Sequence, residues 1–200
     1  MNSVLSTKYV FRTTYAILAA LLFLSVAARA DDLAERIVER LASYPVVRAD
    51  FVQERMVASL TRPVTSSGRM VLSRDQGLLW QIEQPVKEML VFSATGTTEG
   101  GIVQAETGRL IRAIIGADLR ELRQTFDIEA RGDLDRWLLR LRPKGREVAQ
   151  YLRGIDLAGG KHLEVIGIAE ANGDSLTMRM RNFVVATDLD AAERRRFLAP

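Results

Sequence analysis

Residues 49–92 constrain the fold more than any other part of the chain, because apolar and polar side chains alternate there over four successive segments. A period of two places alternate side chains on opposite faces of a β-strand. Proline, glycine or short polar runs separate the segments, as turns do. The stretch therefore predicts four antiparallel strands with one apolar face that other parts of the chain must cover. The expected strands are 48–60, 67–74, 78–83 and 87–93.

Two other segments have the period of an amphipathic helix. Residues 32–44 carry one apolar stripe and end at Pro45, which cannot continue a helix. Residues 106–126 carry a second stripe, which Gly116 is predicted to divide into two short helices. The stripe residues are Leu33, Ile37, Leu41 and Tyr44 in the first segment, and Ile111, Ile115, Leu119, Leu122 and Phe126 in the second.

The remainder of the chain reads as further short strands and two short helices. Residues 94–101 are expected to form a turn flanking a short strand. Asn172-Gly173 predicts a hairpin with a type I′ turn, in which both central residues have positive φ. Strands are expected at 126–130, 137–141, 155–157, 162–169 and 176–181, and helices at 147–153 and 188–197. The expected fold is a single α+β domain, residues 31–200, built on a curved antiparallel sheet.

The apolar faces of these strands predict the lining of the concave side of the sheet. Methionine is common among them, and its flexible, polarisable side chain suits irregular apolar guests. By itself, the alternation is more typical of a filled core than of a cavity. The predicted lining residues are Phe51, Met70, Leu72, Trp80, Met89, Val91, Trp137, Leu139, Met178 and Met180.

The first thirty residues are interpreted as a secretory signal peptide. A positively charged start precedes the apolar run 16–28, and Ala28-Arg29-Ala30 has the pattern of a cleavage site. Three of the 28 basic residues and none of the 25 acidic ones lie in this segment, which leaves 25 of each sign. The mature chain is therefore neutral, and its charge gives no indication of nucleic-acid binding. It has no cysteine for a lipid anchor, so we expect a released periplasmic protein.

Residues suited to catalysis or metal binding are scarce. His162 is the one histidine, no cysteine is present, and no Gly-x-Ser-x-Gly or phosphate-binding glycine motif occurs. A transition-metal site needs a cluster of such side chains. Asp188 and Asp190 are interpreted as helix caps and His162 as a structural residue. We therefore expect no catalytic residue, no metal and no cofactor.

The ordered motifs of residues 49–92 resemble those of the LolA-type outer-membrane lipoprotein carriers, which are periplasmic lipoprotein chaperones. The matching residues are Phe51-x-Gln53, Gly68 six residues before Arg74, Trp80 six residues after it, and Gln84-Pro85 followed by 89–91. The resemblance implies an unclosed β-barrel whose hydrophobic interior is capped by helices. It weakens along the chain, and it is greater to a divergent LolA-related branch associated with other lipids or lipid-linked products.

By the same resemblance, Arg74 matches an arginine that helps hold a lid closed over the cavity. Strand alternation places it beside Met70 and Leu72, and a guanidinium can donate to lid carbonyls. A second interpretation is an arginine at a strand end, turned to solvent beside Asp75. The chain departs from the main members at Asp75, where they have proline, and at 97–101, where they have an aromatic strand.

Three hypotheses for function follow. The first is a carrier that binds acyl chains of lipoproteins or lipids and shuttles them from the inner to the outer membrane. The resemblance implies an inner-membrane export or release complex and an outer-membrane acceptor as partners, with neither nucleic acid nor a stable membrane anchor. The second is a non-catalytic interaction module of an envelope export system with a filled core. The third, a cofactor-free hydrolase, lacks any motif that favours it.

Overall fold

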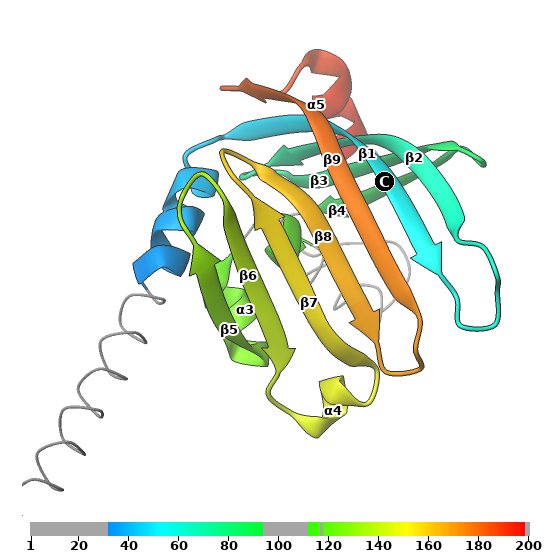
Figure 1. Cartoon of the computed structure of the whole chain (residues 1–200). Coiled ribbons are helices and arrows are strands. Elements are labelled where there is room, and N and C mark those ends of the chain that lie inside the picture. Colours follow the sequence, from blue (N-terminus) through cyan, green and yellow to red (C-terminus); the bar gives the residue numbers. More distant parts are fainter. Residues whose placement is uncertain (1–31, 94–111, 117, 199–200) are drawn as a thin grey trace, which may run out of the picture.

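Nine antiparallel strands form one curved, unclosed sheet in the computed structural model, which describes residues 32–93, 112–116 and 118–198 (Figure 1). Their order across the sheet is β4-β3-β2-β1-β9-β8-β7-β6-β5, so β4 and β5 are the edges of the sheet formed by the described residues. This is the α+β fold predicted from the alternation. The strands are β1 Val46–Met56, β2 Val64–Ser73, β3 Gly77–Gln84, β4 Glu88–Ser93, β5 Phe126–Gly132, β6 Trp137–Pro143, β7 Leu152–Gly159, β8 Leu163–Glu170 and β9 Ser175–Ala186.

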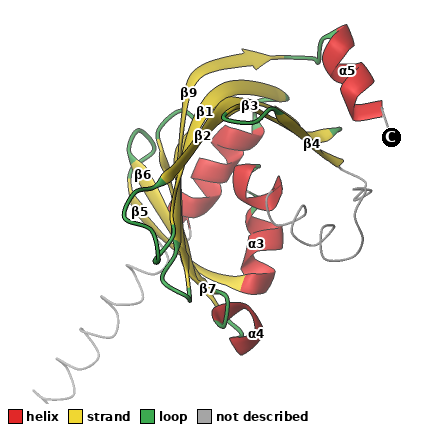
Figure 2. Cartoon of the chain, turned by 90° about the vertical axis from the view of Figure 1, so that its right-hand side faces the viewer, coloured by secondary structure: helices red, strands yellow, loops and turns green. Residues whose placement is uncertain are grey.

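Helices cover the concave side of the sheet (Figure 2). Residues 32–42 form the first, residues 112–115 a short second one, and α3 spans Leu119–Thr125. Gly116 lies between the last two, where the sequence predicted a break. The described stripe residues of these helices are buried or half-buried, as the helical period requires. The short helix α4, Arg146–Ala149, connects β6 to β7.

The β2–β3 hairpin explains the spacing of the 68–80 motif. Its turn lies at residues 74–76, so Met70 pairs with Trp80 and Leu72 with Leu78. Residues six positions to either side of Arg74 therefore lie near each other on neighbouring strands. Gly68 sits at a register shift where an added Cβ would lie 1.9 Å from the carbonyl oxygen of Gln81. Any side chain at this position would force the two strands apart.

The register of β4 corrects two of the predicted lining residues. Met89 pairs with Gln81 and Val91 with Leu79, and directly paired residues share a face. Met89 and Val91 therefore lie on the convex face, and Met89 is 44% exposed. Leu90 and Phe92 occupy the concave face in their place, opposite Trp80 and Leu78. A one-residue difference in pairing exchanges the two faces of a strand, and local alternation does not fix that choice.

The turn between β8 and β9 also differs from the type I′ turn expected at Asn172-Gly173. Gly173 has a φ of 96°, but Asn172 does not have positive φ. The Gly173 N–H donates to the carbonyl of Glu170, and the Glu170 N–H donates to that of Asp174. This is a three-residue loop that ends in a left-handed glycine, the alternative way to match the twist of a hairpin. The expected helix at 147–153 is likewise shorter, because β7 begins at Leu152.

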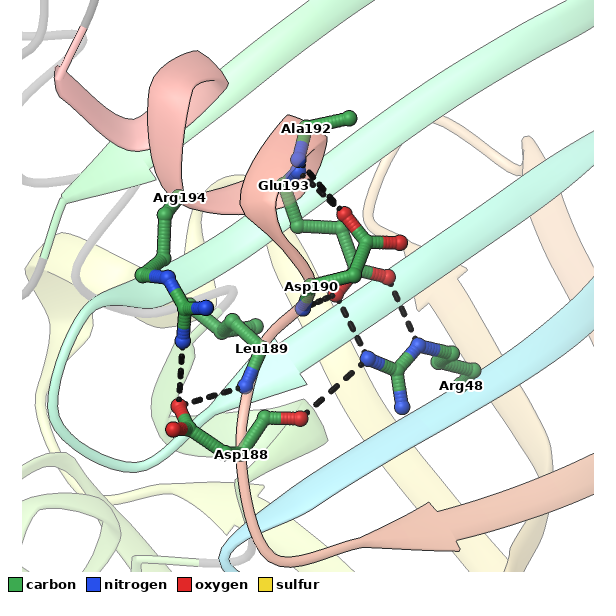
Figure 3. Close-up of polar contacts among 7 residues, drawn as sticks. All are labelled: Arg48, Asp188, Leu189, Asp190, Ala192, Glu193 and Arg194. Atoms are coloured by element: carbon green, nitrogen blue, oxygen red, sulfur yellow. Dashed lines mark hydrogen bonds and ion pairs between the residues drawn. The ribbon is translucent and has the colours of Figure 1, made fainter.

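Helix α5, Ala191–Leu198, lies outside the arch on the convex side, where it contacts β3 and β4 (Figure 2). Asp190 is its cap: the Asp190 carboxylate accepts the N–H groups of Ala192 and Glu193 at 2.8 and 2.7 Å. The Glu193 carboxylate in turn accepts the N–H of Asp190 and a two-pronged contact from Arg48 of β1 (Figure 3). The expected signal peptide, 1–30, and the turn expected at 94–101 lie outside the described residues.

Candidate functional site

An apolar cavity of about 250 Å³ lies between the concave face and the helical residues 112–115. Strands from both halves of the sheet build its wall, since β8 and β9 follow directly on β1 in the strand order. Its lining is aliphatic and aromatic, with one glutamine among the described residues. The lining residues are Gln53, Trp80, Ile82, Leu90, Phe92, Ile114, Ile115, Ile166, Ile168, Leu176 and Met178.

Only two of the predicted lining residues, Trp80 and Met178, border this cavity. Met70, Leu72 and Met180 border a separate space of about 20 Å³ beneath the helix at 32–42, which has room for no more than a water. Phe51 packs against Trp80 with ring centroids 4.3 Å apart. The predicted set therefore divides between the cavity wall and the packed core.

Trp137 and Leu139 belong to the filled half of the molecule. Both are almost fully buried, at 2% and 1% exposure, within the main apolar cluster. The indole N–H of Trp137 donates to the carbonyl of Gly160 at 2.8 Å, which satisfies its one polar group inside the core. Neither residue borders the apolar cavity.

Several lining residues were not predicted to be part of the site. Ile166 and Ile168 alternate along β8, and Leu176 continues the Met178–Met180 face by one further step of two. That periodicity was the available signal for all three. Ile114 and Ile115 come from the helix instead, and only the tertiary structure brings them over the sheet. Gln53 lies in the cavity wall, and its amide makes no side-chain hydrogen bond within the described part of the chain.

Arg74 turns inward and joins two helices to the sheet. Its Nη1 donates to the carbonyl of Gly116 at 2.6 Å, and its Nη2 donates to that of Leu41 at 2.5 Å. Leu41 lies in the last turn of the helix at 32–42, and Gly116 directly follows residues 112–115. The solvent-exposed interpretation of Arg74 is therefore wrong, because the guanidinium is held between backbone carbonyls. Both acceptors belong to the parts of the chain that cover the concave face.

Burial of the Arg74 charge is energetically unfavourable. Burial lowers the pKa of its guanidinium below the ordinary value, and the nearby Asp118 carboxylate opposes that shift. Its Nε is buried without a hydrogen-bond partner among the described residues. A buried donor left unpaired destabilises the arrangement that creates it. The contact between Arg74 and the covering helices is therefore held by two hydrogen bonds against a desolvation penalty.

His162 has a structural environment. Its ring stacks on Phe183 at a centroid distance of 4.5 Å and lies 5.1 Å from Tyr44. Burial is the main cause that lowers the pKa of its imidazole, which favours the neutral ring. No group of three or more His, Cys, Asp or Glu side chains among the described residues is arranged to hold a metal ion. No helix in the described parts of the chain is long and apolar enough to cross a membrane.

The fold is similar to that of a solved structure. A chain of the Pseudomonas aeruginosa MucA/MucB complex matches with a TM-score of 0.51 and 13% identity, over 82% of this chain and 60% of that one. This chain thus spans less than two thirds of that protein's length. No protein-family model matches the sequence, and no match was found among curated proteins.

Two further matches carry names that mention lipoprotein sorting or the LolA superfamily. One is a Vibrio parahaemolyticus domain assigned to outer membrane lipoprotein sorting, with a TM-score of 0.43 and 9% identity over 86% of this chain and 98% of that one. The other is a LolA superfamily protein of Nitrosomonas europaea, with a TM-score of 0.39 and 10% identity over 80% and 96%. LolA-type structures are thus among the matches, as the sequence resemblance predicted. At these identities the likeness concerns the fold alone.

Proposed function

We propose that this protein is a periplasmic carrier that holds acyl chains of a lipoprotein or lipid in the apolar cavity. The observation that carries this proposal is the cavity itself: about 250 Å³ of space with an almost entirely apolar wall. This space is far larger than the water-sized voids of well-packed cores, and we infer that an apolar ligand binds in it. Apart from the Gln53 amide, the wall has only apolar side chains, which suit a hydrocarbon better than a polar substrate.

The cavity as described suits only part of an acyl chain. Sites for whole small ligands usually have volumes of about 300–1,000 Å³. Ile114 and Ile115 form the movable side of the wall, because they belong to a short helix rather than to the sheet. Entry of a complete chain would displace residues 112–116, which we call the lid. Arg74 holds the lid at the Gly116 carbonyl, so opening breaks that hydrogen bond.

Burial of hydrocarbon supplies the driving force. Each methylene group removed from water contributes about 0.8 kcal/mol, so several of them offset the loss of the Arg74 contacts. A carrier of this kind needs neither a catalytic group nor a cofactor. The cargo enters when the free energy gained by burying its hydrocarbon exceeds the cost of opening the lid. It leaves when an acceptor buries the hydrocarbon more favourably.

The cellular part of the proposal rests on the sequence resemblance and the expected signal peptide. The carrier would take cargo from an inner-membrane export or release complex and pass it to an outer-membrane acceptor. The alternative is an interaction module with a filled core. The packed half of the molecule around Trp137 and Leu139 supports it. The two functions differ in one measurable property, which is whether the purified protein contains or binds lipid.

A test of the carrier function combines lipid analysis with a matched pair of variants. Mass spectrometry of an organic extract of the protein, purified from periplasm, should find stoichiometric lipid or acylated peptide. Ile168→Glu places a charge in the cavity wall and should abolish binding of an apolar fluorescent probe. Ile168 is half-buried, so this change perturbs folding less than a charge at the buried Trp80 or Leu72 would.

Val165→Glu is the control, because Val165 lies on the same strand but faces outward and pairs with Arg179. It should bind the probe as the unsubstituted protein does. An empty extract together with no probe binding by the unsubstituted protein would contradict the carrier function. The interaction module would then be the better account.

A further inference from the structure

Exposed apolar side chains gather at one end of the sheet. Five of the ten exposed large apolar side chains among the described residues lie in or beside the connections at that end, and we call them the apolar rim. Leu60 is 48% exposed and Val86 is 73% exposed, and both lie in loops between strands. The apolar rim consists of Met56, Leu60, Val64, Val86 and Tyr151.

Strand register places these residues at the same end. Met56 pairs with Ser175, Arg55 with Val64, and Ser67 with Gln84, so residues 57–63, 85–87 and 171–174 all leave the sheet there. The connection 144–151 joins them, because Leu152 pairs with Glu170. Direct contacts link neighbouring loops: the Asp174 carboxylate accepts the Ala58 N–H at 2.9 Å, and the Ala171 N–H donates to the Tyr151 carbonyl at 2.9 Å.

The opposite end of the sheet has the reverse character. Its connections are residues 74–76, 133–136, 160–162 and 187–190, which are rich in aspartate, arginine and lysine. Their two leucines, Leu134 and Leu189, are half-buried and buried respectively. Among the described residues of these connections, no large apolar side chain is exposed. The connections at this end therefore lack exposed large apolar side chains, although the strand residues Val184 and Val185 of β9 are 54% and 43% exposed near it. The apolar rim differs in that its exposed side chains lie in or beside several connections.

The charges at the rim favour an anionic partner. The connections there contain four exposed cations, Arg62, Lys87, Lys144 and Arg146, against the two carboxylates of Glu147 and Asp174. One charge of each sign already has partners. Asp174 accepts from Ala58 and lies 3.5 Å from Arg55, and Lys144 donates to the Arg123 carbonyl and lies 3.8 Å from Asp127. Three cations and one carboxylate remain among the described residues of these connections. Exposed apolar side chains interspersed with lysine and arginine are the composition of segments that bind anionic bilayer surfaces.

The cavity lies just inside the rim. Ile82 is two residues from the end of β3, and Leu176 is the second residue of β9. Both line the cavity, as do Gln53 and Ile168 a few residues from the same end. An acyl chain drawn from a bilayer at the rim would reach apolar side chains of the cavity wall without crossing the polar end of the sheet.

We propose that the apolar rim docks transiently on an anionic phospholipid bilayer, so that acyl cargo passes between the bilayer and the cavity. This inference rests on the proposed carrier function for the cargo, but the docking itself is measurable without it. A few loop side chains bury too little surface for permanent anchoring, which suits a protein that must leave the membrane again. Cations at the rim add attraction that salt screens.

The experiment measures co-sedimentation with vesicles, using protein purified from periplasm with its N-terminus established by mass. Vesicles of phosphatidylethanolamine with phosphatidylglycerol should bind it, and phosphatidylcholine vesicles should bind it less. The double variant Leu60→Ser, Val86→Ser should lower the vesicle affinity by roughly tenfold, since each side chain removes buried apolar surface. Its binding of an apolar fluorescent probe in solution should not change.

Val184→Ser, Val185→Ser is the matched control, because these exposed valines lie near the opposite end of the sheet. The control should keep the vesicle affinity of the unsubstituted protein. Equal vesicle binding by the rim variant, or an equal loss in the control, would overturn the proposal. Absence of vesicle binding by the unsubstituted protein would also overturn it and would make the rim a surface for a protein partner. Vesicle docking without probe binding would retain the rim and refute the carrier function.

Discussion

Arg74 is the residue on which the closed arrangement of the concave face depends. One guanidinium donates to the ends of two separate covering segments, at Leu41 and Gly116. Both acceptors are backbone carbonyls, so the contacts constrain the chain path rather than a particular side chain. The same guanidinium keeps one buried Nε unpaired. The two hydrogen bonds stabilise this contact, and the unpaired Nε donor lowers that stabilisation. The contact can therefore form and also be broken.

We expect Arg74→Leu to ease lid opening. Hydrogen bonds that involve a charged group contribute about 1.5–3 kcal/mol, so the loss of two of them should lower the free energy of unfolding by a few kcal/mol. A larger open fraction tightens the apparent affinity for a ligand that needs the open form. Stopped-flow binding of an apolar probe should therefore show faster association in the variant than in the unsubstituted protein.

Arg69→Leu is a control from the same strand. Arg69 is exposed on the convex face, where it lies 3.8 Å from Asp50 and 3.4 Å from Glu83. The Arg69→Leu variant should associate with the probe at an unchanged rate. Its stability should change little, because exposed ion pairs contribute about 0–1 kcal/mol. Slower association in Arg74→Leu would argue that the arginine helps to form the binding site rather than to close it.

At the scale of elements, α5 is held on the convex side by a capping box that is also an ion pair. Asp190 and Glu193 stand three residues apart and satisfy each other's backbone N–H groups, as a capping box requires. Glu193 additionally binds Arg48 through both carboxylate oxygens at 2.6 Å (Figure 3). A helix of this length is marginal alone, so its docking depends on this contact and on burial of Leu189.

Docking of α5 should weaken in acid. The Arg48 guanidinium is the main cause that holds the pKa of the Glu193 carboxyl below its ordinary value of 4.5. The pKa of Asp190 is lowered too, chiefly by the N–H of Glu193. A carboxyl group whose pKa is lowered by docking stabilises the docked form at a pH above its ordinary pKa. That stabilisation is lost as the pH falls through the lowered pKa.

Hydrogen exchange of the α5 amides, followed from neutral to acidic pH, measures this effect. Exchange should accelerate as pH falls below about 4.5, beyond the change expected from intrinsic rates. Glu193→Gln should show fast exchange already at neutral pH and a flatter dependence, whereas Glu54→Gln, an exposed control, should match the unsubstituted protein. A steep acid transition that persists in Glu193→Gln would assign the pH dependence to other groups.

At the scale of the molecule, one sheet supports two kinds of interior. Residues around Trp137, Leu139 and Leu157 form a packed core, while the part under residues 112–115 keeps a cavity. The curvature of the sheet is common to both parts, so the difference comes from how fully the helices fill the space above it. An unfilled apolar space lowers stability by forgoing contacts, and a carrier would retain it because the space is its binding site.

A substitution that fills the cavity should therefore raise the free energy of unfolding and weaken ligand binding. Ile168→Phe adds apolar volume to the wall from a half-buried position. Cavity-filling changes commonly raise the free energy of unfolding by about 0.5–2 kcal/mol, and urea denaturation would measure this. Binding of the apolar probe should fall at the same time. Lower stability with unchanged probe binding would mean that the space is not available to a ligand.

The sequence predicted the elements well, because alternation and helical stripes are local properties. The β2–β3 hairpin and the break at Gly116 follow from spacing within a few residues. The spacing left Arg74 either inward-facing or turned to solvent, and its contacts with Leu41 and Gly116 decide for the first. The predicted lining was less accurate. Met89 and Val91 lie on the convex face, since the pairing of β4 with Leu79 and Gln81 decides which alternate set faces inward. Trp137 and Leu139 have the expected face but lie in the filled part.

Residue type and short spacing in the sequence were enough to predict the strands and the helical stripes, and they showed that the chain has no cysteine and no Gly-x-Ser-x-Gly motif. The tertiary structure alone decided which apolar residues border empty space and which are packed. It also joined Arg48 to Glu193, 145 positions apart, and gathered the apolar rim from separate loops. Pairing register and helix placement fix these features, and both arise from contacts between distant parts of the chain that no local pattern encodes.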